Sequence, residues 1–547
     1  MISSLTNKSK SRTKFKSRTK SKKHINNKPT QICELSKTLL KQNTTHTHYI
    51  KYENYIKSIV NSFTTSKNIL LLLTDIFKSK NTINFTITCN EQHLDEYTRI
   101  PPFIEIFKFL ITKEEFINKF SLNEQKQLHL FIDNNNNKHK SSHASSHASS
   151  HISKITTFYN FISKSNIGKK LSSLYYSLDN SIKSELTLKY PSILFHNLLI
   201  NSYTSFEIIE DLEINIKQLY TFSIKWKGKQ LDNLLYLFMY KNTSSNISNL
   251  KYINKIGNEI IKRILFFNEF LGVDKLPSKF IIFLTDNKKE IDEELLSQIH
   301  FKTLNINTAV TNGTDVIIYR KEELLKSIFH ELIHFHNLDF RHIPETLLNY
   351  LKQTHNIKDD NEYTLFECVT ESLANILNNI FLSSDIEEFT NNLVNELMFS
   401  TTQVAKILSI CNYKSWNEFA ILDSSDSSDN NKHKHKHKHI YKHNIKKQFK
   451  QDSCVFSYYI LKFYILLNLE HYFNNCLDTK LKFIQTEKSF KSLITLFDIS
   501  RNNLYLKDII NNILHSMSNS VSKHKKYNKT DKIRKTLRMT CIESNIV

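Results

Sequence analysis

The chain has 547 residues, of which 40% are hydrophobic, so it can bury a large core divided among two to four folded units. Its formal charge of +22 would suggest a nucleic-acid partner, but three segments hold the excess: residues 1–33 carry ten Lys/Arg and no acid, 432–450 carry eight and none, and 522–540 carry eight against Asp531. The remaining body is close to neutral, and its five isolated glycines allow neither a G-x-G-x-x-G fingerprint nor a P-loop, which disfavours nucleotide-dependent enzymes.

The three basic segments are typical of disordered, solvated arms. They would bind polyanions weakly through counterion release, or serve as an address signal, and we treat them as accessory. An N-terminal transit peptide is an alternative for residues 1–33, because they lack acids, although they are rich in Lys and poorly amphipathic.

Apolar runs and cysteines together indicate an intracellular, cytoplasmic protein without a membrane span. The longest apolar run starts at Cys454, is interrupted by Lys462 and is too short to cross a bilayer, and no secretory apolar region follows the N-terminus. The seven cysteines include no C-x-x-C pair, so they indicate neither a disulfide framework nor a cysteine zinc module. A reducing compartment fits best.

Two low-complexity inserts divide the chain. Residues 133–153 repeat Ser-Ser-His-Ala, and residues 423–443 alternate Lys and His. Their histidines could hold metal loosely, but the lysines would repel a cation, so disordered repeats are favoured. The expected organisation is a basic arm (1–33), a helical N-terminal region (34–132), a linker (133–153), a mixed core (154–420), a second insert (421–447), a helical C-terminal region (448–521) and a basic tail (522–547).

The mixed core contains the clearest strand signals. An alternating run from Tyr220 leads to a turn at Gly228, a short apolar run starts at Lys279, and Asn312-Gly313 separates two strand-like runs, which predicts a hairpin. A helical pattern lies between the first two runs, and another follows the hairpin. This order predicts an α+β fold, a small mixed sheet flanked by helical regions.

The helix expected after the hairpin, from Glu322 to about Phe335, carries H-E-x-x-H at His330, Glu331 and His334. Chance would place such a motif somewhere in this chain with odds of roughly one in twenty, so its surroundings must decide. At about 100° per residue the two imidazoles lie one turn apart on the face opposite the apolar stripe. Two such rings can bind one Zn²⁺, while the intervening carboxylate reaches the metal-bound water.

Zinc in a catalytic site needs a third protein ligand. The metzincin pattern is excluded, because Asn337 and Phe340 stand where it requires Gly and His or Asp. His336 is rotated about 200° from His334 and is expected to be structural or at the surface. Asp339 and His342 fall at or beyond the end of the helix, and ligation by either would need an unusual bend.

A second helix expected within residues 361–381 offers better candidates, because Glu367 and Glu371 lie one turn apart opposite its apolar face. Two like charges on one stripe are mildly unfavourable unless something uses them. One carboxylate could ligate the metal while the other accepts the spare ring N–H of a ligand histidine. The alternative is a solvated acidic face.

A helix bearing HELIH followed by a helix bearing ECVTE resembles the gluzincin metallopeptidases. The resemblance implies a zincin-like catalytic core within residues 154–420, one Zn²⁺ per chain held by His330, His334 and Glu367, Glu331 as general base, and Glu371 as the carboxylate that supports a histidine. The stretch before the motif and the compositional bias are also similar to zinc metallopeptidases of large nucleocytoplasmic DNA viruses, which would place the protein in host cytoplasm or the virion.

The same resemblance implies a Tyr or His that hydrogen-bonds the oxyanion, and a peptide or protein substrate bound along an edge strand before the active helix. Tyr363 is the first candidate for the donor, ahead of Tyr319 and His342, although such a residue is more often structural. Residues 308–311 are the expected edge segment, unless they form an ordinary hairpin strand. The rival interpretation is a non-catalytic polyanion-associated or virion structural protein with a vestigial zincin fold.

Overall fold

The computed structural model describes most of the chain outside the low-complexity and basic segments. The expected arm, both inserts and the first half of the basic tail lie largely outside the described residues. The described residues are 31–92, 94, 103–137, 157–162, 165–190, 204–240, 246–272, 275–355, 364–421, 450–521 and 535–544. Among them, no helix is long and apolar enough to cross a membrane.

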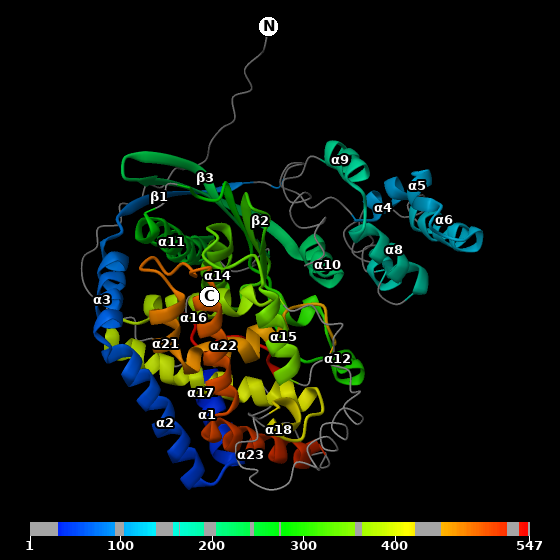
Figure 1. The fold of residues 1–547 in the computed structure, drawn as a ribbon. Coiled ribbons are helices and arrows are strands. Elements are labelled where there is room, and N and C mark those ends of the chain that lie inside the picture. The colour runs from blue at the N-terminus through cyan, green and yellow to red at the C-terminus, as the bar shows by residue number, and fades with distance from the viewer. Residues whose placement is uncertain are drawn as a thin grey trace.

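A six-stranded mixed sheet lies in the upper part of the molecule in Figure 1 and has helices against it, so the predicted α+β class is confirmed. Its strands, in spatial order, are β1 (Phe85–Gln92), β2 (Ile216–Trp226), β3 (Lys229–Tyr240), β4 (Lys279–Phe283), β7 (Asp315–Ile318) and β6 (Ala309–Thr311). β3, β4 and β7 are parallel, whereas β1–β2, β2–β3 and β6–β7 are antiparallel pairs. The strand β6 therefore forms one edge of the sheet.

Both predicted hairpin turns are present. Lys227 and Gly228 have φ values of 48° and 79°, the left-handed pair that a tight two-residue turn between β2 and β3 requires. Between β6 and β7, Gly313 has φ 87°, and the Asn312 side chain accepts the N–H groups of Thr314 and Asp315. The strand β1 was not expected, because its segment lies in the region read as mostly helical.

The sheet is buried on both faces, and alternate residues of β4 show this. Phe280 and Ile282 belong to the core that holds the H-E-x-x-H helix, whereas Ile281 and Phe283 belong to a second core on the other face. Such continuous apolar strands are typical of parallel strands covered on both sides. The second core is formed with α4 (Phe103–Ile111), α5 (Glu114–Ile117), α6 (Leu122–Asn137), α8 (Asn166–Tyr176), α9 (Asn180–Lys189) and α10 (Phe206–Asn215). Figure 1 shows most of this group to one side of the molecule.

The larger core is formed by helices from both ends and the middle of the chain. The N-terminal and central helices are α1 (Gln31–Asn43), α2 (His46–Thr65), α3 (Lys67–Thr82), α11 (Asn246–Leu271), α12 (Glu293–Gln298), α13 (Thr303–Ile306), α14 (Leu324–Phe335), α15 (Glu345–Thr354), α16 (Phe366–Leu382), α17 (Ile386–Ile410) and α18 (Trp416–Phe419). The C-terminal ones are the π-helix η2 (Phe456–Leu461), α20 (Lys462–Leu467), α21 (Leu469–Cys476), α22 (Glu487–Arg501) and α23 (Leu504–Val521). A short ladder of β5 (His300–Phe301) and β8 (Lys450–Gln451) joins the middle of the chain to its C-terminal part.

The basic-tail prediction for residues 522–547 is wrong where the structure describes them. Residues 536–542 are buried, with Leu537, Thr540 and Cys541 fully inaccessible. The segment runs beside residues 289–291, where the N–H of Leu537 donates to the Lys289 carbonyl. Its sequence, TLRMTCIES, has few charges of its own, and the lysines that suggested a solvated tail stand mostly before it. Residues 535–544 are called the C-terminal segment below.

Candidate metal centre

The helix α14 places the motif residues in the interior. It begins at Leu324, two residues later than expected, because Glu323 adopts a left-handed backbone with φ 61°. Eleven of its twelve residues are buried, since apolar neighbours cover one side and charged and polar groups of other helices cover the side that carries His330. The motif therefore faces a closed, polar part of the interior rather than bulk solvent.

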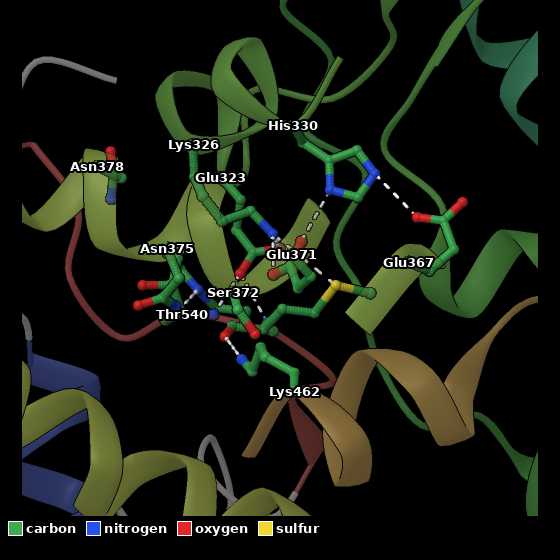
Figure 2. A network of polar contacts seen from close by, with 12 residues as sticks. Glu323, Lys326, His330, Glu367, Glu371, Ser372, Asn375, Asn378, Lys462 and Thr540 are labelled. Atoms are coloured by element: carbon green, nitrogen blue, oxygen red, sulfur yellow. Dashed lines mark hydrogen bonds and ion pairs between the residues drawn. The ribbon is translucent and has the colours of Figure 1, made fainter. Parts of the chain in front are cut away.

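The helix α16 packs against α14 and supplies the carboxylates. Glu367 stands in its first turn and Glu371 one turn later, as the spacing predicted. The side chains of His330 and Glu367 point toward each other in Figure 2, with Glu371 on the opposite side of the imidazole. Glu371 is fully buried, so the alternative of a solvated acidic face does not apply to it.

Three donor atoms converge on one point. The Nε2 atoms of His330 and His334 are 3.2 Å apart, and Oε2 of Glu367 lies 3.2 Å from the first and 3.3 Å from the second. Among the described residues this is the group of His, Cys, Asp and Glu side chains that could hold a metal ion. The structure thus brings together the three residues that the sequence singled out.

The separations of the three donor atoms, which form a triangle, can be compared with those around a bound metal ion. A tetrahedral ion bound at about 2.0 to 2.1 Å keeps its ligand atoms about 3.3 to 3.4 Å apart, whereas neighbouring ligands of an octahedral ion at the same distance are about 2.9 Å apart. The observed 3.2 and 3.3 Å separations agree with the tetrahedral value. Two nitrogens and one carboxylate oxygen leave one tetrahedral position for solvent or substrate.

The hydrogen bonds of the two rings also suit a cation. His330 Nδ1 lies 3.0 Å from Oε2 of Glu371, and His334 Nδ1 lies 2.7 Å from Oδ2 of Asp339. Burial opposes the negative charge of Glu371, but Lys326 and His330 lower its pKa to about 2, so it accepts a ring N–H. With a metal bound, each Nδ1 would carry the proton and each Nε2 would present a lone pair to the ion. Without a metal, Glu367 can accept the Nε2–H groups of protonated rings, because the neighbouring carboxylates outweigh burial and raise the pKa of both histidines.

Asp339 contacts the site as a hydrogen-bond partner of His334, whereas from the sequence it was considered only as a metal ligand. The helix ends in a left-handed residue, Asn337 with φ 52°, and the N–H of Leu338 bonds back to the carbonyl of Ile333. This Schellman turn reverses the chain and brings Asp339 to His334. Asn is a frequent left-handed residue at this position, so the turn itself had a local signal.

The triangle opens onto a cavity of about 400 Å³. Glu331 lines it, is 3% exposed, and has a pKa raised by burial above the ordinary carboxylate value. One wall is residues 308–311, which include the edge strand β6, and another is residues 451–454. The expected edge segment therefore borders the motif.

The other expected residues lie elsewhere. His336 packs against Phe267 with ring centroids 5.5 Å apart and takes no part in the triangle. Tyr319 belongs to the second core and His342 is exposed, and neither lines the cavity. Tyr363, the first candidate for the oxyanion donor, lies outside the described residues.

Among the described residues, Tyr458 is the tyrosine that lines the cavity, and no pattern in the sequence indicated it. Its ring centroid is 5.9 Å from that of His330, and it stands in the π-helix η2. π-Helical turns often occur at functional sites, but they leave no reliable pattern in a single sequence.

Neither a scan of protein-family models nor searches of curated proteins and of solved structures found a match to this chain. The function is therefore inferred from the geometry of the site.

Proposed function

We propose that the protein is a zinc-dependent metallopeptidase that hydrolyses peptide bonds. His330, His334 and Glu367 would be the zinc ligands and Glu331 the general base. The observation that carries the proposal is the triangle of donor atoms, 3.2 to 3.3 Å on each side, beside a buried carboxylate in a cavity large enough for a peptide segment. Imidazole and carboxylate ligands in tetrahedral spacing favour Zn²⁺ over Mg²⁺ or Ca²⁺, which prefer oxygen ligands.

Bound zinc would supply a Lewis acid that lowers the pKa of water and polarises the scissile carbonyl. Glu331 takes the proton from the attacking water and delivers it to the leaving amine. Glu371 and Asp339 keep the two imidazoles in the tautomer that directs Nε2 to the metal. Each protein group thus performs one binding or proton-transfer task.

Two further groups would act on the substrate. Tyr458 lines the cavity beside His330, and its hydroxyl can donate a hydrogen bond to the developing oxyanion, the role first considered for Tyr363. The edge strand β6 can bind an extended peptide by adding a strand to the sheet. A substrate held in this way would run along the wall of the cavity, past Glu331.

The test compares purified full-length protein with Glu331→Gln, using Glu345→Gln, an exposed change on α15, as the matched control. We expect about one zinc per chain in all three proteins, and hydrolysis of a fluorogenic peptide library that falls by roughly 10² to 10⁴ only in Glu331→Gln. A Tyr458→Phe arm should retain zinc and lose roughly 10² to 10³ in kcat. Wild-type activity in Glu331→Gln, or no zinc in the wild type, would contradict the proposal. Zinc without hydrolysis would favour the vestigial, non-catalytic alternative.

A further inference from the structure

A chain of buried charges extends from His330 into the interior (Figure 2). Glu371 accepts from His330 through Oε2 and from Lys326 through Oε1, at 3.0 and 2.5 Å. Lys326 Nζ also lies 3.7 Å from Oε2 of Glu323. The side chains of Lys326, Glu371 and Glu323 are 2%, 0% and 0% exposed, so water does not screen these contacts.

The chain of charges ends on the backbone of the C-terminal segment. Oε1 of Glu323 accepts the N–H groups of Met539 and Thr540 at 2.6 and 2.7 Å. The Met539 sulfur lies 3.8 Å from Lys326 Nζ, and Met539 lines the same cavity as the metal centre. The segment is therefore part of the wall of the site.

The interior holds this segment in place mainly through side chains of other elements. An extended buried segment outside a sheet must satisfy its carbonyl groups in this way. The donors to its carbonyl oxygens are Lys406 to Thr536, Tyr459 to Leu537, Gln403 to Arg538, Lys462 to Met539, Cys33 to Cys541 and Asn378 to Ile542. These donors come from α1, α16, α17, α20 and η2, so the position of the segment depends on the whole core.

The backbone of Glu323 adds a second, independent observation. A left-handed conformation in a residue other than Gly is uncommon and costs on the order of 1 kcal/mol, so the surroundings must hold it there. The N–H of Glu323 donates to Oε1 of Glu543, which belongs to the same segment, at 2.5 Å. The C-terminal segment thus binds both the backbone and the side chain of Glu323.

We propose that Glu323 and Lys326 are positioning residues, through which the C-terminal segment holds the His330 ring in its metal-binding orientation. The inference rests on the proposed metal site. The segment fixes Glu323, Glu323 fixes the ammonium of Lys326, and the hydrogen bond from that ammonium holds the Glu371 carboxylate toward Nδ1 of His330. Without Lys326, the buried Glu371 carboxylate would lose its counter-charge and its second hydrogen-bond partner.

Lys289 provides a matched control for Lys326. Both ammonium groups are 2% exposed, both lie against Oε2 of Glu323, and both lie within 3.8 Å of the Met539 sulfur. They differ in two contacts: Lys289 Nζ donates to Oε2 of Glu323 at 2.7 Å, whereas Lys326 Nζ lies 3.7 Å from that oxygen and donates to Oε1 of Glu371 at 2.5 Å. Replacing Lys289 acts on His330 only through Glu323, whereas replacing Lys326 removes the group that contacts Glu371 directly.

The first experiment measures zinc affinity by chelator competition on full-length wild type, Lys326→Met and Lys289→Met. We expect a 10- to 100-fold weaker affinity in Lys326→Met, in the range for changes beyond the ligands themselves, and a clearly smaller loss in Lys289→Met. Equal affinities in all three proteins would overturn the inference while leaving the proposed peptidase intact. An equal loss of zinc affinity in both variants would mean that removing either buried charge destabilises the site in general. That result would also overturn the inference.

The main measurement of the second experiment is made on the wild type, so it remains decisive even if a variant does not fold. If the segment favours zinc binding, zinc must in turn stabilise the segment, because coupling between two sites is reciprocal. Hydrogen exchange of the amides in residues 536–542 should therefore slow on zinc binding in the wild type and in Lys289→Met, and slow less in Lys326→Met. Exchange that is unchanged by zinc in the wild type would overturn the coupling. A wild type that binds no zinc would overturn the proposed function and this inference together.

Discussion

His330 and His334 stand one turn apart on α14, yet different regions of the molecule hold the two rings. His334 bonds to Asp339, five residues later, across the turn at Asn337. His330 bonds to Glu371, 41 residues later on α16, and beyond it to the buried charges that end at the C-terminal segment. One ring is therefore held by a local turn and the other by the folded interior, so the metal centre cannot be complete before the core is.

The two supports also differ electrostatically. Among the residues that the structure describes, no ammonium group contacts Asp339, which accepts a second, longer hydrogen bond of 3.3 Å from Thr370. Glu371 is fully buried and forms an ion pair with Lys326. Loss of the Glu371 charge leaves the buried Lys326 ammonium with only the more distant carboxylate of Glu323, at 3.7 Å, whereas loss of the Asp339 charge strands no described ammonium.

The largest expected effect comes from breaking these supports one at a time. Glu371→Gln should cost about 3 to 5 kcal/mol of unfolding free energy, because it leaves Lys326 buried without its closest partner, and should weaken zinc binding roughly 10- to 100-fold. Asp339→Asn should weaken zinc binding by a similar factor at a smaller cost in stability. Denaturant unfolding of the metal-free proteins and chelator competition measure the two quantities separately.

The comparison fails if the two variants lose equal stability, since the supports would then be equivalent. It also fails if Asp339→Asn binds zinc like the wild type, because the local hydrogen bond would not fix the ring. Glu345→Gln serves again as a control for the substitution itself, because its carboxylate is exposed.

A smaller effect is expected from trimming the C-terminal segment. Leu537 is fully buried in the larger core, so Leu537→Ala should cost about 2 to 5 kcal/mol. Leu188, 83% exposed on α9, is the matched control, and its replacement by Ala should stay within about 0.5 kcal/mol. A Leu537→Ala variant as stable as the wild type would contradict the burial of this segment and favour the solvated tail expected from the sequence. Urea midpoints at constant slope measure both.

The contrast between local and distant contacts also explains what the sequence could predict. The hairpin at Asn312-Gly313, the helix that carries His330 and the pairing of Glu367 with Glu371 on one helical face each follow from spacing within about twenty residues. The convergence of the two helices was a reasonable expectation, because both carry unusual polar groups opposite apolar stripes. Asp339 was within reach of the same reasoning, since Asn337 marks a turn.

The remaining features depend on contacts that no local pattern encodes. The expected start of the helix at Glu322 puts Glu323 in its first turn, whereas the left-handed backbone of Glu323 turns it toward a segment more than 200 residues away. The C-terminal segment follows a run of lysines, and that run dominated the charge argument. Tyr458 reaches the cavity because α16 and η2 pack together, which depends on the assembled core.

The smallest expected effect uses a histidine that lacks what His330 and His334 have. His355 is 1% exposed and lies among the rings of Phe419, Phe456 and Tyr464, with Thr354 and Tyr464 hydroxyls as its partners and no carboxylate. Burial, aided by Arg501, lowers its pKa to about 3. Burial alone therefore disfavours the charged ring, whereas carboxylates outweigh burial at His330 and raise its pKa.

The lowered pKa of His355 predicts how the free energy of unfolding changes as the pH falls. Because the folded protein holds His355 neutral and the unfolded chain protonates it near pH 6.5, its contribution is complete above pH 6.5 and is lost as the pH falls toward 3, at about 1.4 kcal/mol per pH unit. His355→Gln can keep both hydrogen bonds but cannot titrate, so the stability gap between wild type and variant should narrow by that amount per unit below pH 6.5. Urea unfolding of both proteins between pH 7.5 and 5.5 measures the gap, and other titrating groups cancel in the difference. A gap that stays constant would mean that His355 binds a proton as readily in the folded protein as in the unfolded chain, and burial without a carboxylate would then not lower its pKa.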